Sequence, residues 1–370
     1  MRHAVKICSL LPSGTEIVFA LGLGDQLVGV SDLCDYPAEA RHKPVISRSL
    51  IDTTVLSSAE VEARMRALRT AGASPFHIEA AVLRQEAPDL VLTQDTCDIC
   101  DATAADVQRA LDGIQPPPQL LILRPRTVSE ILESIMAVGQ AAGVPDRACT
   151  LVASLEARVH AVASKAAHAQ HRPRLVSFEG INPLVAGGHW IPELKILAGG
   201  RDDLFSPGCP AQRLTWTTIR DYDPEILVIT PCSSGLERSL RELHSLVEQD
   251  GWWELQAVRA REVYVIEHDY FSRPGPRIVM GLEILAQIVH PELFHGMIPE
   301  ATALKLELPP GCTCPPAALA TYFQPYPAVE GAPLNWCRAE VEKAATRCAP
   351  PSAVADAGKR RCAPVALRKL

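Results

Sequence analysis

The sequence has no excess of positive charge, which bears first on nucleic acid as a partner. Its 36 Lys and Arg residues face 43 Asp and Glu residues, so the formal net charge is -7 at pH 7. Proteins that bind nucleic acid usually gather Lys and Arg on one face, and this sequence has no basic stripe and no RNA-binding signature. We therefore expect no nucleic acid as a partner.

Long apolar runs are also missing. No run reaches the roughly 18 residues that a membrane-spanning helix needs. The apolar stretch near the start is interrupted at residues 13–16, and its pattern predicts a strand, a turn and a helix capped by Ser13, with Glu16 completing a capping box. This pattern does not predict a signal peptide. We expect a soluble, cytoplasmic protein, and a periplasmic or extracellular location is less favoured.

The motifs of several enzyme classes are absent. We find no P-loop and no GxGxxG loop for nucleotides, no nucleophile elbow for hydrolysis and no HExxH zinc motif. The sequence therefore favours a binding protein over an enzyme.

Cysteine, by contrast, is abundant, with twelve residues in the chain. Without a secretion signal, reduced thiols are expected rather than a disulfide framework. Cys97 and Cys100 form a CxxC motif that allows several interpretations: an incidental or structural pair, the lining of a ligand site, half of a metal site, or a redox pair. The body of the chain has no second pair with metal-ligand spacing.

Strands and helices alternate along most of the chain, which predicts an α/β fold with parallel sheets. Two apolar strands opened by proline, at residues 88–93 and 223–230, have nearly the same pattern and predict two similar Rossmann-like lobes. We expect a first lobe at residues 1–145, a joining helix at 146–171, a second lobe at 172–298, and a largely disordered tail rich in Pro, Ala and Cys at 299–370.

The most informative stretch runs from Phe178 to Phe205. It predicts a strand end, a glycine-rich loop and a helix that opens at residues 189–192. His189 and Trp190 follow two glycines, where backbone can approach a ligand closely, and Glu179 lies just past the strand end, where open α/β sheets bind ligands. An ordinary strand-loop-helix corner with His189 as a capping or core residue is the alternative.

Polar or aromatic loops follow several other predicted strands, and in two facing lobes they would border one cleft. Their aromatic residues suit a large, flat, partly apolar ligand better than a phosphate. Asp269 follows a strand, where it could bind a ligand amide or cap a helix. The aromatic residues expected in the cleft are Tyr36, Trp190, Trp216, Tyr270 and Phe271.

A series of short motifs runs through both lobes, from about residue 5 to residue 295. In chain order they are Ile7–Glu16, Ala20–Gly24, Leu27–Ser31, Asp35–Pro37, Pro88–Val91, Gly188–Leu194, Ala198–Gly200 and Ser272–Arg277. Their residues and order resemble those of cobalamin-binding proteins of the class III periplasmic-binding-protein-like family. The forms that these motifs take around Gln94 and His189 resemble those of a branch of this family that often lacks a secretion signal.

The resemblance implies two Rossmann-like lobes, a rigid joining helix and a corrinoid held in the cleft with little closure. It implies docking on a membrane transporter through one surface glutamate per lobe, and Glu79 matches the first position whereas Thr217 occupies the second. The positions that match corrinoid contacts in the family are Leu33, Gln94, Glu179 and Asp269.

We therefore expect non-enzymatic binding of cobalamin or a related corrinoid, for uptake, for sequestration or for delivery to a cobalamin-dependent enzyme. The alternatives are another metal chelate, such as haem or a siderophore, and thiol-dependent redox or metal handling through Cys97 and Cys100. No catalytic cofactor is expected. The expected ligand-binding residues are Leu33, Tyr36, Gln94, Glu179, His189, Trp190, Trp216, Asp269, Tyr270 and Phe271.

Overall fold

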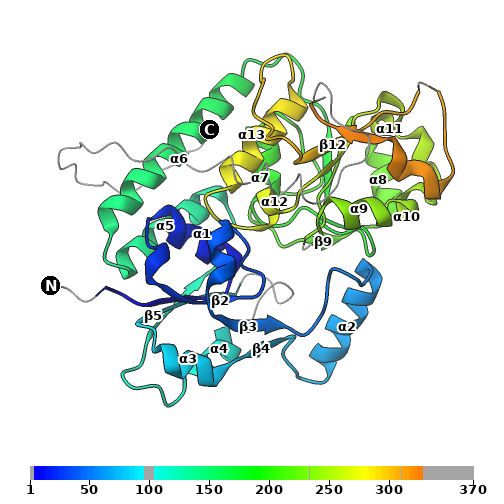
Figure 1. Cartoon of the computed structure of the whole chain (residues 1–370). Helices are drawn as coiled ribbons and strands as arrows, with labels where there is room; N and C mark the ends of the chain where they lie inside the picture. Colours follow the sequence, from blue (N-terminus) through cyan, green and yellow to red (C-terminus); the bar gives the residue numbers. More distant parts are fainter. Residues whose placement is uncertain (1–3, 96–103, 233, 310, 328–370) are drawn as a thin grey trace.

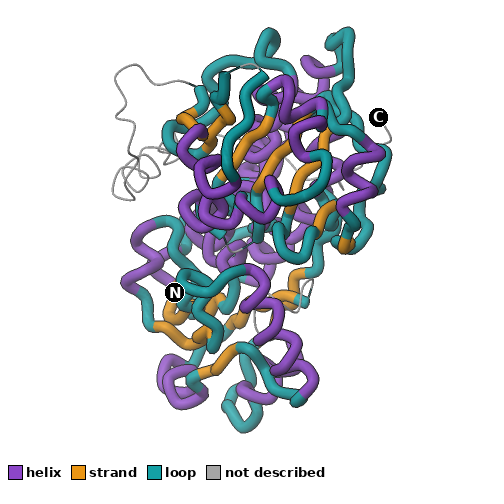
Figure 2. The backbone as a smooth tube through the Cα atoms, turned by 90° about the vertical axis from the view of Figure 1, so that its right-hand side faces the viewer, coloured by secondary structure: helices purple, strands orange, loops and turns teal. Residues whose placement is uncertain are grey.

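The computed structural model describes residues 4–95, 104–232, 234–309 and 311–327. These residues form two α/β lobes, one above the other in Figure 1, and helix α6 (Pro145–Ala166) runs along one side of both. Figure 2, turned by 90°, shows strands of each lobe lying among helices. The predicted fold class, two lobes with largely parallel sheets, is confirmed by this arrangement.

The first lobe is built on a six-stranded sheet with the order β4-β3-β2-β1-β5-β6. Neighbouring strands are parallel except β3 and β4, which are antiparallel. The strands are β1 (Ile7–Ser9), β2 (Leu27–Ser31), β3 (Val45–Ser49), β4 (Phe76–Ile78), β5 (Leu90–Gln94) and β6 (Gln119–Leu123). The helices are α1 (Pro12–Ala20), η1 (Gly24–Gln26), η2 (Ala38–His42), α2 (Ser58–Thr70), α3 (Ala80–Glu86), α4 (Ala104–Leu111) and α5 (Val128–Ala141).

Both faces of this sheet are covered, as the apolar strands predict. Successive side chains of a strand point to opposite faces. Ile7 of β1 joins the core that contains α1 and α5, and its neighbour Cys8 joins a second core that contains α3 and α4.

The second lobe is built on a five-stranded sheet with the order β13-β12-β11-β10-β7, in which β7, β10 and β11 are parallel and the last two strands are antiparallel. The strands are β7 (Leu175–Phe178), β10 (Ile226–Ile229), β11 (Val263–Ile266), β12 (Ala303–Leu306) and β13 (Phe323–Pro325), and a separate pair is formed by β8 (Val185–Ala186) and β9 (Gln212–Arg213). The helices are α7 (Ile191–Leu197), α8 (Trp216–Tyr222), α9 (Leu236–Glu242), α10 (His244–Val247), η3 (Trp252–Glu254), α11 (Gln256–Ala260), α12 (Asp269–Ser272), α13 (Ile278–Val289) and η4 (Pro316–Tyr322).

The second lobe extends past residue 298, where the sequence analysis placed its end. Strands β12 and β13 complete its sheet, and Leu306, Leu319 and Phe323 are buried in its core. Leu304 and Leu306 alternate with Lys305, which is a strand pattern that the Pro- and Cys-rich composition of the segment obscured. The expected disorder beyond residue 327 falls outside the described residues.

Helix α6 joins the lobes but is shorter than the predicted 146–171, since it ends at Ala166. Its 22 residues span about 33 Å at 1.5 Å per residue. It packs on α5 of the first lobe and on α7 and α13 of the second, so that one apolar core runs through both lobes on this side. The lobes are therefore joined by packed side chains as well as by the chain itself.

In each lobe, the same kind of turn joins a helix to the central strand that follows it. Ala87 ends α3 and Asp223 ends α8, and these residues have positive φ angles of 44° and 47°. Each is followed by a proline and then by β5 or β10. The repeat predicted from the two proline-opened strands is confirmed.

Two local predictions were wrong. The capping box of Ser13 and Glu16 does not form, because α1 begins at Pro12, its N-cap is Leu11 and no side chain caps it. The cysteines are not all reduced, since Cys149 is disulfide-bonded. Among the described residues, Cys8, Cys34, Cys209, Cys232, Cys312 and Cys314 are not disulfide-bonded.

Candidate ligand-binding cleft

A large cleft lies between the lobes. Its volume is about 2140 Å³, whereas pockets for drug-sized ligands usually measure roughly 300–1,000 Å³. Residues at or just beyond the carboxyl ends of strands border it, from Asp32 and Gln94 in the first lobe and from Glu179, Thr230 and Glu267 in the second. Ligands of open α/β sheets bind at this edge. The cleft therefore has the size and position of a site for a bulky ligand.

Most of the residues singled out from the sequence come together in this cleft. Position alone does not show contact with a ligand, so their binding role stays a prediction. The predicted residues that line the cleft are Leu33, Tyr36, Gln94, Glu179, His189, Trp190, Asp269, Tyr270 and Phe271.

Trp216 is the exception, and its expected place in the cleft is corrected by the structure. It begins α8, its ring lies 6.0 Å from that of Trp252, and its indole N–H donates to the carbonyl of Asp250. It is not among the residues that line the cleft. Trp216 packs within the second lobe because helix α8 turns it toward Trp252, which its position in the sequence did not reveal.

The remaining predicted positions lie elsewhere. Glu79 precedes α3 on the surface of the first lobe, with Arg48 at 3.9 Å and His77 at 3.6 Å, and its role in docking stays a prediction. Thr217 lies in the first turn of α8. Cys97 and Cys100 fall outside the described residues, so neither the metal nor the redox alternative is tested.

His189 and Trp190 form a stacked pair on the second-lobe wall. Their ring centroids are 5.6 Å apart, and the Trp190 indole N–H donates to the carbonyl of Phe271 at 2.7 Å. His189 has a φ of 53°, a conformation that costs free energy in a non-glycine residue, and its backbone N–H donates to the carbonyl of Cys209 at 2.7 Å. Burial, with the nearby Arg126 charge, lowers the pKa of His189 and favours a neutral ring.

Glu179 explains the two glycines before His189. The backbone N–H of Gly188 donates to both carboxyl oxygens of Glu179, at 3.2 and 3.1 Å, and a Cβ at position 188 would lie 2.6 Å from Oε2. The glycine thus allows the backbone to approach this carboxyl group rather than a phosphate. Burial raises the pKa of Glu179 to about 7 despite the opposing effects of Lys195 and the backbone amides.

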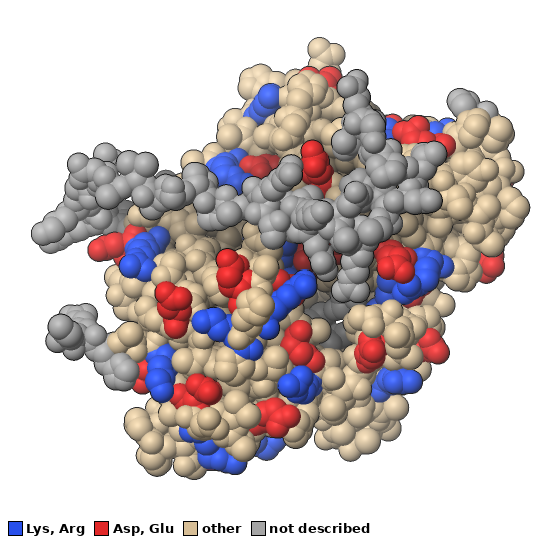
Figure 3. Space-filling model, in the orientation of Figure 1, with Lys and Arg blue, Asp and Glu red and all other residues tan. Residues whose placement is uncertain are grey.

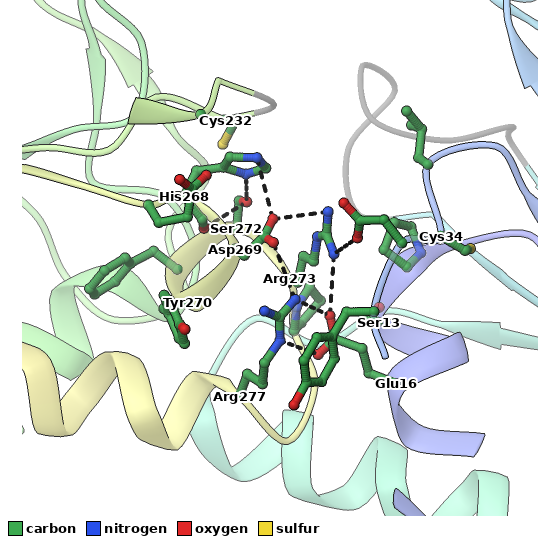
Figure 4. A pocket seen from close by; sticks show the side chains of 18 of the residues that line it. Ser13, Glu16, Cys34, Cys232, His268, Asp269, Tyr270, Ser272, Arg273 and Arg277 are labelled. Atoms are coloured by element: carbon green, nitrogen blue, oxygen red, sulfur yellow. Dashed lines mark hydrogen bonds and ion pairs between the residues drawn. The ribbon is translucent and has the colours of Figure 1, made fainter. Parts of the chain in front are cut away.

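A cluster of five charged residues, here called the base contact, joins the lobes at the cleft. Arg277 donates to Glu16 at 2.6 and 3.0 Å and Arg273 to Asp35 at 2.6 Å, so first-lobe carboxylates meet second-lobe guanidinium groups. Asp269 lies 2.9 Å from Arg273. Figure 4 shows Glu16 and Asp269 pointing toward the two arginines. The base contact consists of Glu16, Asp35, Asp269, Arg273 and Arg277.

The ionisation of the base contact follows from its pairing. Burial alone would raise the pKa of Asp269, but Arg273, His268 and Arg277 outweigh it and lower that pKa to about 2. Arg277 also stacks 4.0 Å from the centre of the Tyr36 ring. The sequence analysis missed this cluster, although Glu16 and the Ser272–Arg277 motif were among the residues that carried the resemblance.

A second connection, here called the mouth contact, joins the lobes on the side away from α6, where α2 approaches the second lobe in Figure 1. The side chain of Glu242 accepts hydrogen bonds from the backbone N–H and the hydroxyl of Ser58, at the start of α2. Arg238 donates to the carbonyl of Thr53 at 2.7 Å, and Arg213 pairs with Glu62. The mouth contact consists of Thr53, Ser58, Glu62, Arg213, Arg238 and Glu242.

Nine acidic residues and six arginines are among the described residues that line the cleft. Two of the nine, Glu179 and Glu267, have pKa values raised to about 7, so the remaining seven carboxylates roughly balance the arginines. Every one of these arginines lies within ion-pair distance of a carboxylate: Arg41, Arg158, Arg238, Arg241, Arg273 and Arg277. In the face shown in Figure 3, acidic and basic side chains are interspersed over the described surface. The cleft therefore suits a neutral or cationic ligand better than an anionic one.

A family model described as a periplasmic binding protein matches residues 7–270. The chain belongs to the periplasmic binding protein family. Proteins of this family bind a solute and are not enzymes, which confirms the prediction of a non-enzymatic protein.

Several relatives of this periplasmic binding protein are known. The uncharacterized ABC transporter substrate-binding lipoprotein YvrC of Bacillus subtilis is 26% identical, over 79% of this chain and 82% of that protein. The vitamin B12-binding protein of Photorhabdus laumondii is 24% identical, over 76% and 87%.

Solved structures share the fold. The periplasmic heme-binding protein RhuT of Roseiflexus sp. RS-1 has a TM-score of 0.59 and 21% identity, over 78% of this chain and 99% of RhuT. The vitamin B12-binding protein BtuF of Vibrio cholerae has a TM-score of 0.56 and 19% identity, over 77% and 97%. Across the residues that the structure describes, no helix has the length and apolar character to cross a membrane, and no group of three or more His, Cys, Asp and Glu could hold a metal ion.

Proposed function

We propose that the cleft binds a corrinoid such as cobalamin. The observation that carries the proposal is the pairing of each described cleft arginine with a carboxylate of the protein. A corrinoid presents neutral carboxamides around its ring, and these groups need no unpaired guanidinium group. The cleft volume of about 2140 Å³ suits a ligand of this bulk.

The same pairing argues against haem, the main alternative. Haem carries propionate carboxylates, which bind best to arginine or lysine side chains that have no other partner. The described cleft lining contains no lysine. An anionic siderophore would meet the same difficulty, whereas a neutral or cationic metal chelate would not.

The similarity to vitamin B12-binding proteins and to an ABC transporter substrate-binding lipoprotein supports a role in uptake with a membrane transporter as partner. Of the three roles that the sequence analysis left open, these relatives favour uptake over sequestration or delivery. Docking through Glu79 belongs to this proposal.

A retention experiment tests the ligand. The purified protein is incubated with excess cyanocobalamin, hemin or ferrioxamine in parallel and desalted, and its visible spectrum is recorded. We expect corrin absorbance to be retained at close to one equivalent per chain. Retention of hemin without cyanocobalamin would contradict the proposal.

Two tryptophan variants give matched controls. Trp190→Ala removes a ring from the cleft wall and should lose most of the retained corrinoid. Trp216→Ala removes a ring of the same kind outside the cleft and should retain it.

A further inference from the structure

Three residues follow three adjacent strands of the second lobe and face the cleft together. Glu179 comes directly after β7, Thr230 after β10 and Glu267 after β11, and all three line the cleft. Strand β10 lies between the other two, and its last residue, Ile229, pairs with Phe178 on one side and Val265 on the other. With neighbouring strands about 4.8 Å apart, the row that they form extends for about 10 Å. We call it the strand-end row.

The hydroxyl of Thr230 is the least expected member of this row. The residue is only 1% exposed, and its Oγ1 has no hydrogen-bond partner among the described residues. Buried polar atoms in folded proteins nearly always have a partner, and an exception calls for an explanation. Thr230 lines the cleft but its Oγ1 has almost no surface open to it, so the wall must shift slightly on binding before a ligand can supply the missing partner.

The two carboxyl groups beside Thr230 are held by backbone amides and not by cations. Glu179 accepts from the Gly188 N–H at 3.1 Å, and Glu267 accepts from the Leu236 N–H at 3.4 Å. Among the described ion pairs, neither glutamate takes part. The nearest cation to influence Glu179, Lys195, is itself paired with Asp202 at 2.8 Å.

Both carboxyl groups change between the protonated and the ionised form near pH 7. Burial raises the pKa of Glu179 to about 7. Burial likewise raises the pKa of Glu267 to about 7, and the charge of Asp269 adds to this effect. At Glu179, Lys195 and the amides of residues 187 and 188 act against the rise in pKa, and Asp202 supports it. At Glu267, the Leu236 amide and Arg273 act against the rise, and Asp35 supports it.

We propose that the strand-end row of Glu179, Thr230 and Glu267 donates hydrogen bonds to carbonyl oxygens at the edge of the bound ligand. The carboxamides of a corrinoid are groups of this class, so the inference rests on the proposed function. A protonated carboxyl and a hydroxyl each have one hydrogen to donate, and each glutamate also accepts a hydrogen bond from a backbone N–H, of Gly188 or of Leu236. The protonated row thus offers donors to a neutral carbonyl without placing a charge beside it.

The proposal predicts an affinity that falls as the pH rises. An ionised carboxylate can only accept, so it would repel a ligand carbonyl that its protonated form binds. With a pKa of about 7 for both groups, affinity should fall by about tenfold per carboxyl between about pH 6 and pH 8. Burial lowers the pKa of the cleft residues His189 and His268, so neither ring changes charge over most of this interval.

Calorimetric titration of the full chain with cyanocobalamin tests this, because the carboxamides of this probe do not titrate between about pH 6 and pH 8. In buffers of different ionisation enthalpy, binding at about pH 8 should take up between one and two protons, and binding at about pH 6 close to none. Glu179→Gln and Glu267→Gln keep a hydrogen-bond donor but cannot ionise, so each should make the fall in affinity between about pH 6 and pH 8 about tenfold smaller. Glu248→Gln changes an exposed residue outside the cleft and should leave this fall in affinity unchanged.

Thr230→Val separates ligand binding from folding. It replaces an unpartnered hydroxyl with a methyl group of the same shape, so affinity should fall about fivefold or more while the thermal midpoint of the free protein stays equal or rises. Affinity that is independent of pH or increases with pH would overturn the strand-end row alone. Failure of cyanocobalamin to bind at every pH would overturn the proposed function and this inference with it.

Discussion

The base contact and the mouth contact both join the lobes, and their pairs Glu16–Arg277 and Glu62–Arg213 differ in burial more than in chemistry. In the base contact, the side chains of Glu16 and Arg277 are 2% and 9% exposed. In the mouth contact, the side chains of Arg213 and Glu62 are 58% and 20% exposed, whereas those of Arg238 and Glu242 are 9% and 13% exposed. Both contacts pair arginine with glutamate across the cleft. Loss of Arg277 would leave Glu16 as an uncompensated charge away from water, whereas loss of Arg213 would leave Glu62 partly exposed to water.

This difference assigns different tasks to the two contacts. A buried pair cannot separate without a large cost in free energy, so the base contact and the shared core along α6 fix how the lobes are oriented. An exposed pair exchanges its partner for water at little cost. The Arg213–Glu62 pair can therefore separate at little cost while the Glu16–Arg277 pair stays closed.

The largest effect is expected from Arg277→Ala. The variant leaves the buried Glu16 carboxylate without its main partner, and breaking a buried pair in this way costs about 3–5 kcal/mol. Urea unfolding followed by circular dichroism should show this loss in the free energy of unfolding.

Arg241→Ala is the control for this experiment. It removes an arginine that also lines the cleft but is 54% exposed and pairs with Glu237, so the loss should stay below about 1 kcal/mol. Similar losses for the two variants would refute the distinction between buried and exposed contacts.

An intermediate effect is expected when the base contact is titrated with acid. The pKa of Asp269 is lowered in the folded protein from 3.8 to about 2, so its contribution to stability is present above about pH 4 and is lost as the pH falls through about 2. The shift corresponds to about 2 kcal/mol. Urea unfolding at a series of pH values should show this decline in wild type and a shallower one in Asp269→Asn.

The matched control is Asp250→Asn, which removes a highly exposed carboxylate paired with Arg220. This variant should keep the wild-type acid slope. If Asp269→Asn also keeps it, the charge of Asp269 does not stabilise the base contact.

The lobes and most of the cleft were predictable because they depend on local patterns. The proline-opened strands repeat at residues 88–93 and 223–230, and polar residues such as Gln94 and Glu179 follow apolar strands closely. In a parallel sheet the carboxyl ends of strands lie at one edge, so residues in these positions had to border the same space.

Contacts between distant residues could not be predicted in this way. Glu16 fits a capping box locally, but its partner Arg277 lies 261 positions away, and the buried ion pair outweighs a surface cap. Trp216 was grouped with the other aromatic residues expected in the cleft, and only the packing of α8 on Trp252 decided where its ring lies. Thr230 ends a predicted strand like any other residue there, and its missing partner is visible only in three dimensions.

The smallest effect on stability is expected from Arg213→Ala in the mouth contact. The pair with Glu62 is largely exposed, so the free energy of unfolding should change by less than about 1 kcal/mol. Release of bound cyanocobalamin should nevertheless become faster, by up to about fivefold, because the pair links the two lobes on the side away from α6. Stopped-flow chase with excess unlabelled ligand measures this rate. Arg220→Ala breaks an exposed pair within one lobe and should leave release unchanged, and an equal acceleration in both variants would show that the mouth contact does not control exit of the ligand.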